Sequence, residues 1–177
     1  MTTYFISSFF IFAQNKLKMR KLRNPYTRIK DYCCFGCSPD NPDGLNMEFY
    51  EDGDEIYSEW EPKYNFQGYT NVLHGGIQSA LIDEIAYWVV LIKLKTGAVT
   101  TRLDVQLRKP VLMDKGKIKL RANLVEVNRK IAHIAVKLFD SEDNLCAKAS
   151  VHYFTFSVED SIKNWNFPED YSSFFEN

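Results

Sequence analysis

The chain has 177 residues, of which 45% are hydrophobic and 25% charged, so it suits one ordinary domain with one core rather than two full domains. Its 22 basic and 23 acidic residues give a net charge of -1, which removes the overall electrostatic case for a nucleic-acid-binding protein. The charge is unevenly spread, however. Residues 1–30 carry seven basic and no acidic residues, whereas the rest of the chain carries 15 basic and 23 acidic residues. We therefore expect an acidic folded body preceded by a basic leader.

The first residues, MTTYFISSFFIFAQ, form a short apolar run that does not fit a secretory signal. The basic residues follow the run instead of preceding it, and there is no small-residue cleavage pattern. At about ten residues the run is also shorter than the roughly 20 needed to cross a bilayer. Met19 offers a second start, so two alternatives stay open. Residues 1–18 are either an upstream extension that is not part of the protein or a real anchor or targeting segment.

From Leu45 onward the sequence becomes regular. NMEFY and EIYSEW are short aromatic and β-branched runs joined by EDGD, whose Asp-Gly pair is typical of a hairpin turn. Proline, glycine and asparagine then dominate residues 61–76, where neither a strand period nor a helix period survives. The sequence therefore predicts a pair of strands followed by a loop that ends in a helix.

Residues 77–92 predict a buried helix. Of these sixteen positions only Gln78, Ser79, Asp83 and Glu84 are polar. A helix that is apolar on nearly every side lies inside a protein rather than on its surface. The segment is too short for a membrane span and carries two adjacent carboxylates, which excludes that interpretation.

After the helix the period changes to two. Residues 101–107 alternate apolar and polar side chains until Pro110 ends the run. The same alternation follows in residues 118–124, 131–139 and 145–157. Long strands with one polar face, joined by short turns, are typical of an antiparallel sheet with one covered face, and only the helix is apolar enough to cover it. We therefore predict an α+β fold in which a curved antiparallel sheet wraps around one long central helix.

The predicted organisation has three parts. Residues 1–30 form the basic N-terminal extension, residues 31–160 form the folded domain, and residues 161–177 form a C-terminal tail rich in Asp, Ser, Asn and Phe. The four cysteines are too few and too clustered for a secreted disulfide framework. We interpret them as reduced thiols and expect a cytoplasmic protein.

The sharpest motif is HGG at residues 74–76, directly before the helix. Two glycines at a helix start let other atoms approach the backbone and leave unpaired N–H groups pointing outward. With the helix dipole added, such an end suits a carbonyl oxygen that becomes an oxyanion during acyl transfer. The alternative is that Gly75 and Gly76 only allow tight packing between helix and sheet. We expect His74 to cap or brace the helix start.

Asp83 lies in the middle of the apolar helix, where a carboxylate is costly unless it is paired or functional. One alternative is a structural hydrogen bond to a neighbouring strand or helix. Glu84 lies about 100° further around the helix, and we expect it to face solvent or a rim. Gly76 and Asp83 are separated by about 10 Å along the helix axis. If the glycine amides and the Asp83 carboxylate act on one carbonyl, this spacing favours Gly75 from one subunit and Asp83 from another, in a two-fold dimer.

Cys34-Phe-Gly-Cys37 has the spacing of a zinc or redox motif. No second CxxC follows, and no thioredoxin-like βαβ pattern surrounds it. We interpret the pair as structural or incidental, and a zinc- or redox-linked module remains an alternative function. Arg102, Arg108 and Lys109 form a basic cluster in the acidic body that is usable for phosphates, although such a cluster is also typical of a solvated face.

Three segments together resemble a known family. They are CFGCSPDNPDGL near residues 34–45, FQGYTNVLHGGIQSALIDE at residues 66–84 and VTTRLDVQLRKPV at residues 99–111. The combination is similar to the PaaI-type hotdog-fold thioesterases, and the similarity spans about residues 33–157. That resemblance implies hydrolysis of acyl-CoA thioesters at the interface of a homodimer or of a homotetramer.

The resemblance also assigns residues. It implies that Asp83 activates water or attacks the thioester carbonyl, and that the Gly75 amide binds the thioester oxygen. Thr100 matches a serine or threonine that positions the water. Gln67 matches a polar substrate-orienting residue only loosely, because some relatives have Asn where this chain has Gly68. We add His74, Gly76 and Arg102 as expected substrate contacts.

The sequence therefore predicts an acyl-CoA thioesterase that hydrolyses a thioester to a carboxylic acid and CoA. We expect it to need no metal or redox cofactor for this chemistry and to bind neither nucleic acid nor membrane. The alternative from another class is a hotdog module that binds acyl-CoA or a related thioester without turning it over.

Overall fold

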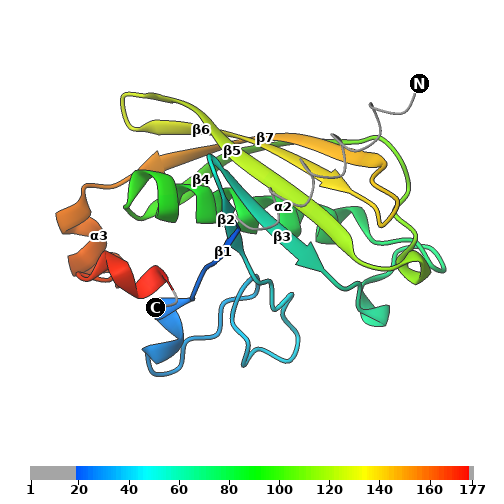
Figure 1. Cartoon of the computed structure of the whole chain (residues 1–177), viewed down its shortest axis with the longest axis horizontal. Helices are drawn as coiled ribbons and strands as arrows, with labels where there is room; N and C mark the ends of the chain where they lie inside the picture. Colours follow the sequence, from blue (N-terminus) through cyan, green and yellow to red (C-terminus); the bar gives the residue numbers. More distant parts are fainter. Residues whose placement is uncertain (1–18, 176–177) are drawn as a thin grey trace, which may run out of the picture.

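The computed structural model describes residues 19–175. Seven strands form one antiparallel sheet in the order β1-β2-β3-β5-β6-β7-β4, and helix α2 (Gly75–Val89) runs along one face of it (Figure 1). In chain order the strands are β1 (Arg20–Lys21), β2 (Tyr50–Asp52), β3 (Glu55–Trp60), β4 (Ala98–Leu107), β5 (Ile118–Asn128), β6 (Ile131–Phe139) and β7 (Leu145–Thr155). The predicted sheet around one helix is confirmed, whereas the alternatives for residues 1–18 lie outside the described residues.

Helix α2 begins two residues earlier than the apolar pattern predicts. His74 is its N-cap and accepts a hydrogen bond from the Gly76 N–H at 2.9 Å. The helix continues as a π-helical turn (Val90–Leu94) and ends where Lys95 takes a left-handed conformation. Its buried apolar side chains form the centre of the core: Leu81, Ile82, Ile85, Ala86, Trp88 and Val89. The helix is thus buried, as its all-round apolar sequence predicts.

Most strands show the predicted alternation, and β4 departs from it. Along β6, Ala132, Ile134, Val136 and Leu138 are buried against the helix. On β4, in contrast, only Ala98 is buried, and Leu103 and Leu107 are exposed. The reason is position: β4 pairs with β7 alone and forms one edge of the sheet. The helix therefore leaves most of β4 uncovered, although the predicted sheet with one face on the helix is confirmed.

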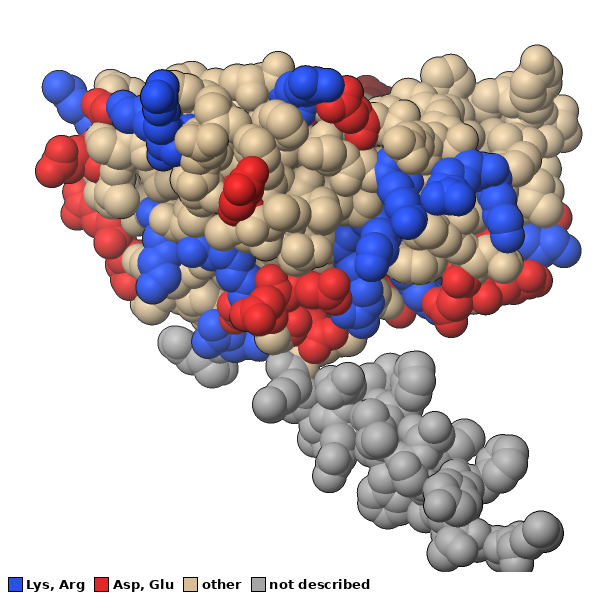
Figure 2. All heavy atoms as spheres, turned by 90° about the horizontal axis from the view of Figure 1, so that it is seen from above, with Lys and Arg blue, Asp and Glu red and all other residues tan. Residues whose placement is uncertain are grey.

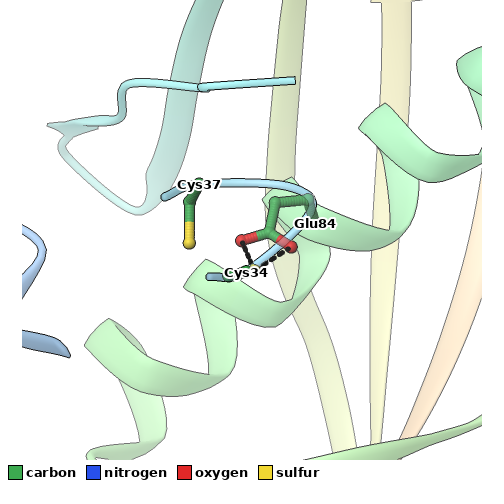
Figure 3. Close-up of side chains that lie close together, drawn as sticks. All are labelled: Cys34, Cys37 and Glu84. Carbon is green, nitrogen blue, oxygen red and sulfur yellow. Dashed lines mark hydrogen bonds between the residues drawn. The ribbon is translucent and has the colours of Figure 1, made fainter. Parts of the chain in front are cut away.

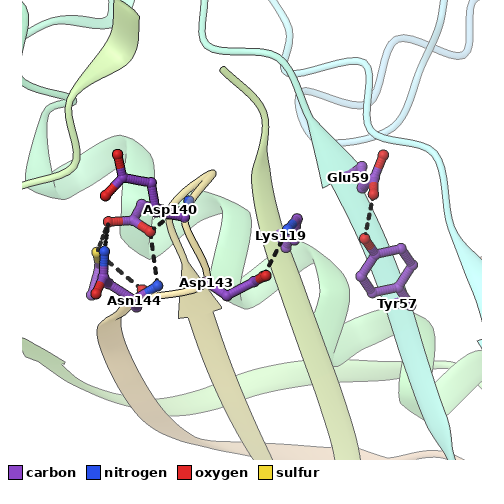
Figure 4. A network of polar contacts seen from close by, with 8 residues as sticks. Tyr57, Glu59, Lys119, Asp140, Asp143 and Asn144 are labelled. Atoms are coloured by element: carbon purple, nitrogen blue, oxygen red, sulfur yellow. Dashed lines mark hydrogen bonds and ion pairs between the residues drawn. The ribbon is translucent and has the colours of Figure 1, made fainter. Parts of the chain in front are cut away.

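Two of the tight turns follow the expected chemistry. Gly53 has a positive φ of 59° between β2 and β3, which the Asp-Gly pair predicts. Between β6 and β7, Asp140 accepts hydrogen bonds from the backbone N–H groups of Glu142 and Asn144 (Figure 4). Asp143 in the same turn pairs with Lys119 at 2.6 Å. These contacts hold the turn between β6 and β7.

Both ends of the described chain pack on the same core. Leu22 and Tyr26 from the N-terminal side and Phe167 and Phe174 from the C-terminal side belong to the buried cluster. Helix α3 (Val158–Trp165) precedes a segment whose Tyr171 hydroxyl donates to the Ile92 carbonyl at 2.7 Å. The described parts of the leader and of the tail are thus docked on the domain, while the three-part division of the chain stays a prediction.

Neither sign of charge dominates the face seen in Figure 2. On the face seen from above, Lys and Arg side chains are interspersed with Asp and Glu (Figure 2). This mixture agrees with the near-neutral net charge of the chain. Within residues 19–175, no helix is long and apolar enough to cross a membrane.

Candidate active site

Asp83 sits where α2, β4 and β7 meet. The Thr100 hydroxyl on β4 donates to Asp83 Oδ1 at 3.0 Å, and the Tyr153 hydroxyl on β7 donates to the same oxygen at 2.7 Å. Tyr153 also reaches the Asp83 backbone carbonyl at 2.7 Å. Among residues 19–175, Asp83 Oδ2 has no hydrogen-bond partner. One carboxylate oxygen is thus fixed and the other is available.

Tyr153 is a site residue that sequence reasoning missed. It is 1% exposed and lies directly opposite Thr100 in the β4–β7 register. Burial, followed by the Asp83 carboxylate, raises the pKa of Tyr153 well above its ordinary value, so the phenol stays a neutral donor. The signal was present in strand parity, since Tyr153 shares the inward face with Val151.

The two glycine amides at the start of α2 differ in their hydrogen bonding. The Gly76 N–H is taken by the His74 ring, so His74 acts as the expected cap. The Gly75 N–H has no acceptor within residues 19–175. A Cβ added to Gly75 would lie 2.9 Å from the Leu107 side chain, which shows how closely β4 approaches the helix start. The Gly75 N–H at this positive end of the helix is therefore free to donate to another group.

A cavity of about 610 Å³ opens beside Gly75. Its wall includes Gln78, Arg108 and Lys109. Gln78 is 4% exposed, and its Oε1 has no hydrogen-bond partner among the described residues, although its Nε2 donates to the Leu73 carbonyl. A buried and unsatisfied acceptor in a cavity wall suits a ligand that donates a hydrogen bond. Sequence reasoning missed Gln78, because a glutamine one turn into a helix carries no distinctive signal.

Several predicted residues, among them Gln67, Arg102 and Asp83, lie away from this cavity. Gln67 accepts a hydrogen bond from the Asn71 N–H at 3.2 Å and so braces its own loop. Arg102 pairs with Asp104 at 2.7 Å on exposed β4. Asp83 lies two turns along the helix from Gly75, and none of the three lines the cavity. Within one chain, the structure therefore brings Asp83 to Thr100 but leaves both apart from Gly75.

The sequence predicts that Glu84 faces solvent or a rim, but the structure places it against a loop. Its carboxylate points at the loop that carries Cys34 and Cys37 (Figure 3). The Cys34 thiol lies 3.8 and 3.9 Å from its two oxygens, and Trp88 Nε1 donates to it at 3.2 Å. Burial, followed by the charge of Cys34, raises the pKa of Glu84 to about 7. The prediction failed because the covering loop precedes the helix by about fifty residues.

The chain is similar in sequence to known thioesterases and esterases. Residues 70–147 match the family model of the thioesterase superfamily. Over 112 residues the chain is 30% identical to a proposed esterase of Saccharolobus solfataricus, which covers 60% of this chain and 69% of that protein. The residues matched by the family model contain the HGG motif, helix α2 and strands β4 to β6.

Two solved structures illustrate the structural likeness. A thioesterase from Haemophilus influenzae has a TM-score of 0.62 and 22% identity, covering 69% of this chain and 86% of that one. A hypothetical thioesterase from Streptococcus pneumoniae, solved with coenzyme A, has a TM-score of 0.53 and 20% identity, covering 58% of this chain and 81% of that one. The likeness shows that the sheet and α2 adopt the predicted hotdog fold.

Proposed function

The chain belongs to the thioesterase superfamily and is a thioester hydrolase, and we propose that its substrate is an acyl-CoA of the kind cleaved by PaaI-type enzymes. Two observations support CoA as the leaving group. Arg108 and Lys109 lie in the wall of the cavity beside Gly75, where two cations suit the phosphates of CoA. The Streptococcus pneumoniae neighbour was solved with coenzyme A.

Asp83 is the proposed base. The observation that carries this assignment is the pair of hydroxyl donors on Asp83 Oδ1, which orients the carboxylate and leaves Oδ2 for a water molecule. In the proposed step the water oxygen bonds to the thioester carbonyl carbon while its proton passes to Asp83. The C–S bond then breaks, and CoA leaves as the thiol after the protonated Asp83 returns that proton to the sulfur. Direct attack by the carboxylate is the alternative role of the same residue.

The Gly75 amide is the proposed oxyanion donor. It lies at the positive end of the α2 dipole and has no acceptor among the described residues. Donors aimed at the oxygen that becomes charged stabilise the transition state more than the bound substrate. His74 and Gly76 form the cap that holds this amide in place, and Gln67 and Arg102 remain predicted substrate contacts.

The active site is proposed to form between two copies of the chain. Gly75 and Asp83 are about 12 Å apart along the helix axis, too far to act on one carbonyl. The β4 edge next to Asp83 exposes Val99, Leu103 and Leu107, and its outer side pairs with no strand among residues 19–175. An apolar open edge favours pairing with a second copy, in a dimer or a dimer of dimers.

The test is thiol release from short, medium, long and aromatic acyl-CoAs by wild type, Asp83→Asn and the control Asp143→Asn. Asp143 pairs with Lys119 on a distant turn. We expect Asp83→Asn alone to lose at least about 100-fold in turnover, or about 2.7 kcal/mol of transition-state stabilisation. Equal turnover by Asp83→Asn would remove Asp83 from the mechanism. Acyl-CoA binding without turnover by wild type would favour the non-catalytic hotdog module.

A further inference from the structure

The cysteine motif and Glu84 converge on one point, although fifty residues separate them in the chain. Cys34 and Cys37 lie on the loop before β2, and Glu84 lies on α2. Their two sulfur atoms and a carboxylate oxygen lie within 4.8 Å of one another (Figure 3). Three atoms that bind metals are thus already gathered before any ion is present. The CxxC spacing alone supplies only two of them.

The charge around Glu84 is uncompensated. Within residues 19–175, no Lys, Arg or His forms an ion pair with Glu84. Its hydrogen-bond donors are Trp88 Nε1 and the Cys34 thiol. A partly buried carboxylate beside two thiols is stabilised by either a proton or a cation. A bound divalent cation would neutralise the group that nothing else in the described chain neutralises.

Gly36 shows that the close approach is built into the loop. A Cβ added at Gly36 would lie 2.1 Å from Glu84 Oε2. Any side chain at position 36 would therefore push the carboxylate away from the thiols. The glycine of the CFGC motif is thus the residue that permits a third ligand to reach the pair.

A second layer of contacts orients the ligands. The Tyr32 hydroxyl lies 3.1 Å from Cys37 Sγ, and Asn24 Nδ2 donates to the same sulfur at 3.4 Å. Trp88 Nε1 donates to the Glu84 carboxylate. Outer donors of this kind are typical of metal sites, where they fix the ligands and stabilise thiolates. A cavity of about 240 Å³ adjoins the cluster and leaves room for a water as a fourth ligand and for entry of an ion.

We infer that Cys34, Cys37 and Glu84 form a binding site for a thiophilic divalent cation, with Zn²⁺ as the best match. Two sulfur ligands disfavour Mg²⁺ and Ca²⁺, and a mixed S₂O set with a water suits four-coordinate zinc. Binding displaces the two thiol protons into solvent. The ion would fasten the loop of residues 33–38 to α2, beside the residue proposed as the base, and this site stands independently of the proposed thioesterase chemistry.

The test uses the full chain, reduced and stripped with a chelator, and then titrated with Co²⁺ as a spectroscopic probe and with Zn²⁺ as competitor. We expect one Co²⁺ per chain, a thiolate-to-metal charge-transfer absorption, and its loss when Zn²⁺ is added. Cys37→Ser and Glu84→Gln should each weaken Zn²⁺ binding by at least about tenfold. Cys33→Ser, which changes an exposed cysteine next to the motif, should leave binding unchanged.

Gly36→Ala keeps all three ligands and is the second variant, should Cys37→Ser fail to fold. We expect it also to weaken Zn²⁺ binding by at least about tenfold, because its methyl group displaces the Glu84 carboxylate. The inference is overturned if the reduced wild type shows no thiolate-to-metal absorption. It is equally overturned if Glu84→Gln and Gly36→Ala bind Zn²⁺ as tightly as wild type, or if the two cysteines only form a disulfide with each other.

Discussion

Asp83 and Glu84 are neighbours in sequence, yet they lie in two different surroundings on helix α2. Asp83 faces the sheet, where the hydroxyls of Thr100 and Tyr153 hold one of its oxygens at the exposed β4 edge. Glu84 faces away from that edge, toward the loop with Cys34 and Cys37. One helical step of about 100° separates a carboxylate held at the β4 edge from one that faces two thiols.

The difference teaches what decides the chemistry of a carboxylate in an apolar helix. Two hydroxyl donors hold one oxygen of Asp83 and leave the other free, which suits a base for water. Thiols and a single indole N–H surround Glu84, which has no cationic partner among the described residues, and this suits a metal ligand. The following variants test this contrast, from the largest expected effect to the smallest.

Tyr153→Phe removes the shorter of the two hydrogen bonds to Asp83 Oδ1 and keeps the ring. A hydrogen bond to a charged group contributes about 1.5–3 kcal/mol, so we expect kcat/KM for the best acyl-CoA to fall by about 10- to 100-fold. Tyr57→Phe is the matched control. The Tyr57 hydroxyl also donates to a carboxylate, that of Glu59 on β3, away from Asp83 (Figure 4). Equal losses in both variants would show that Tyr153 does not orient the base.

Trp88→Phe tests the Glu84 side of the helix. Trp88 is 1% exposed, stacks on Phe49 with ring centroids 4.4 Å apart, and donates to Glu84. We expect the free energy of unfolding to fall by about 2 kcal/mol, because the change leaves a cavity and removes a donor to the carboxylate. Urea unfolding of the chelator-treated protein measures this. A change below about 0.5 kcal/mol would contradict the packing described for Trp88.

Thr100→Val removes the second donor to Asp83 and keeps the shape of the side chain. A single hydrogen bond at an exposed position contributes about 0.5–1.5 kcal/mol, so we expect kcat/KM to fall by about two- to tenfold. Thr100→Ser keeps the hydroxyl and should recover most of the loss. If serine and valine behave alike, the hydroxyl of Thr100 does not position the carboxylate.

Glu51, unlike Glu84, forms ion pairs. Its partners are Arg20 and Lys93, and Lys93 lies in the π-helical turn that continues α2. Burial alone would raise the pKa of Glu51, but hydrogen bonds from Lys93 and Arg20 outweigh it and lower that pKa. The stabilisation is therefore complete above the unfolded-state pKa of about 4.3 and is lost as the pH falls through the lower folded-state pKa.

We expect Glu51→Gln to cost no more than about 1 kcal/mol of unfolding free energy near neutral pH, because its ion pairs lie close to the surface. The difference from wild type should shrink as the pH falls through the folded-state pKa of Glu51. Urea unfolding of both proteins across this pH range measures it. A difference that stays constant at low pH would show that the ion pairs of Glu51 are not its source.

Much of the fold could be predicted because it follows from periodicity. The alternation in residues 131–139 predicts β6 with its exact bounds, and the apolar run at residues 77–92 predicts α2. The exposure of β4 could not be predicted, since alternation reveals that a strand has two faces but not whether it lies at an edge.

The site was predictable only in part. Asp83 and Gly75 stand out locally, because a carboxylate and two glycines are unusual in and before an apolar helix. Tyr153 and the surroundings of Glu84 depend on contacts with residues 70 and 50 positions away. Such contacts are set by strand register and by the path of a loop, and neither leaves a local pattern in the sequence.

The most direct test of the contrast compares Asp83→Asn and Glu84→Gln in parallel, measuring acyl-CoA hydrolysis and Co²⁺ absorption on the same preparations. We predict that Asp83→Asn loses at least about 100-fold in turnover and keeps the thiolate-to-Co²⁺ absorption. Glu84→Gln should weaken Co²⁺ binding and lose less turnover than Asp83→Asn does. Turnover by Asp83→Asn at the wild-type rate would contradict the assignment of the two neighbouring carboxylates to separate tasks.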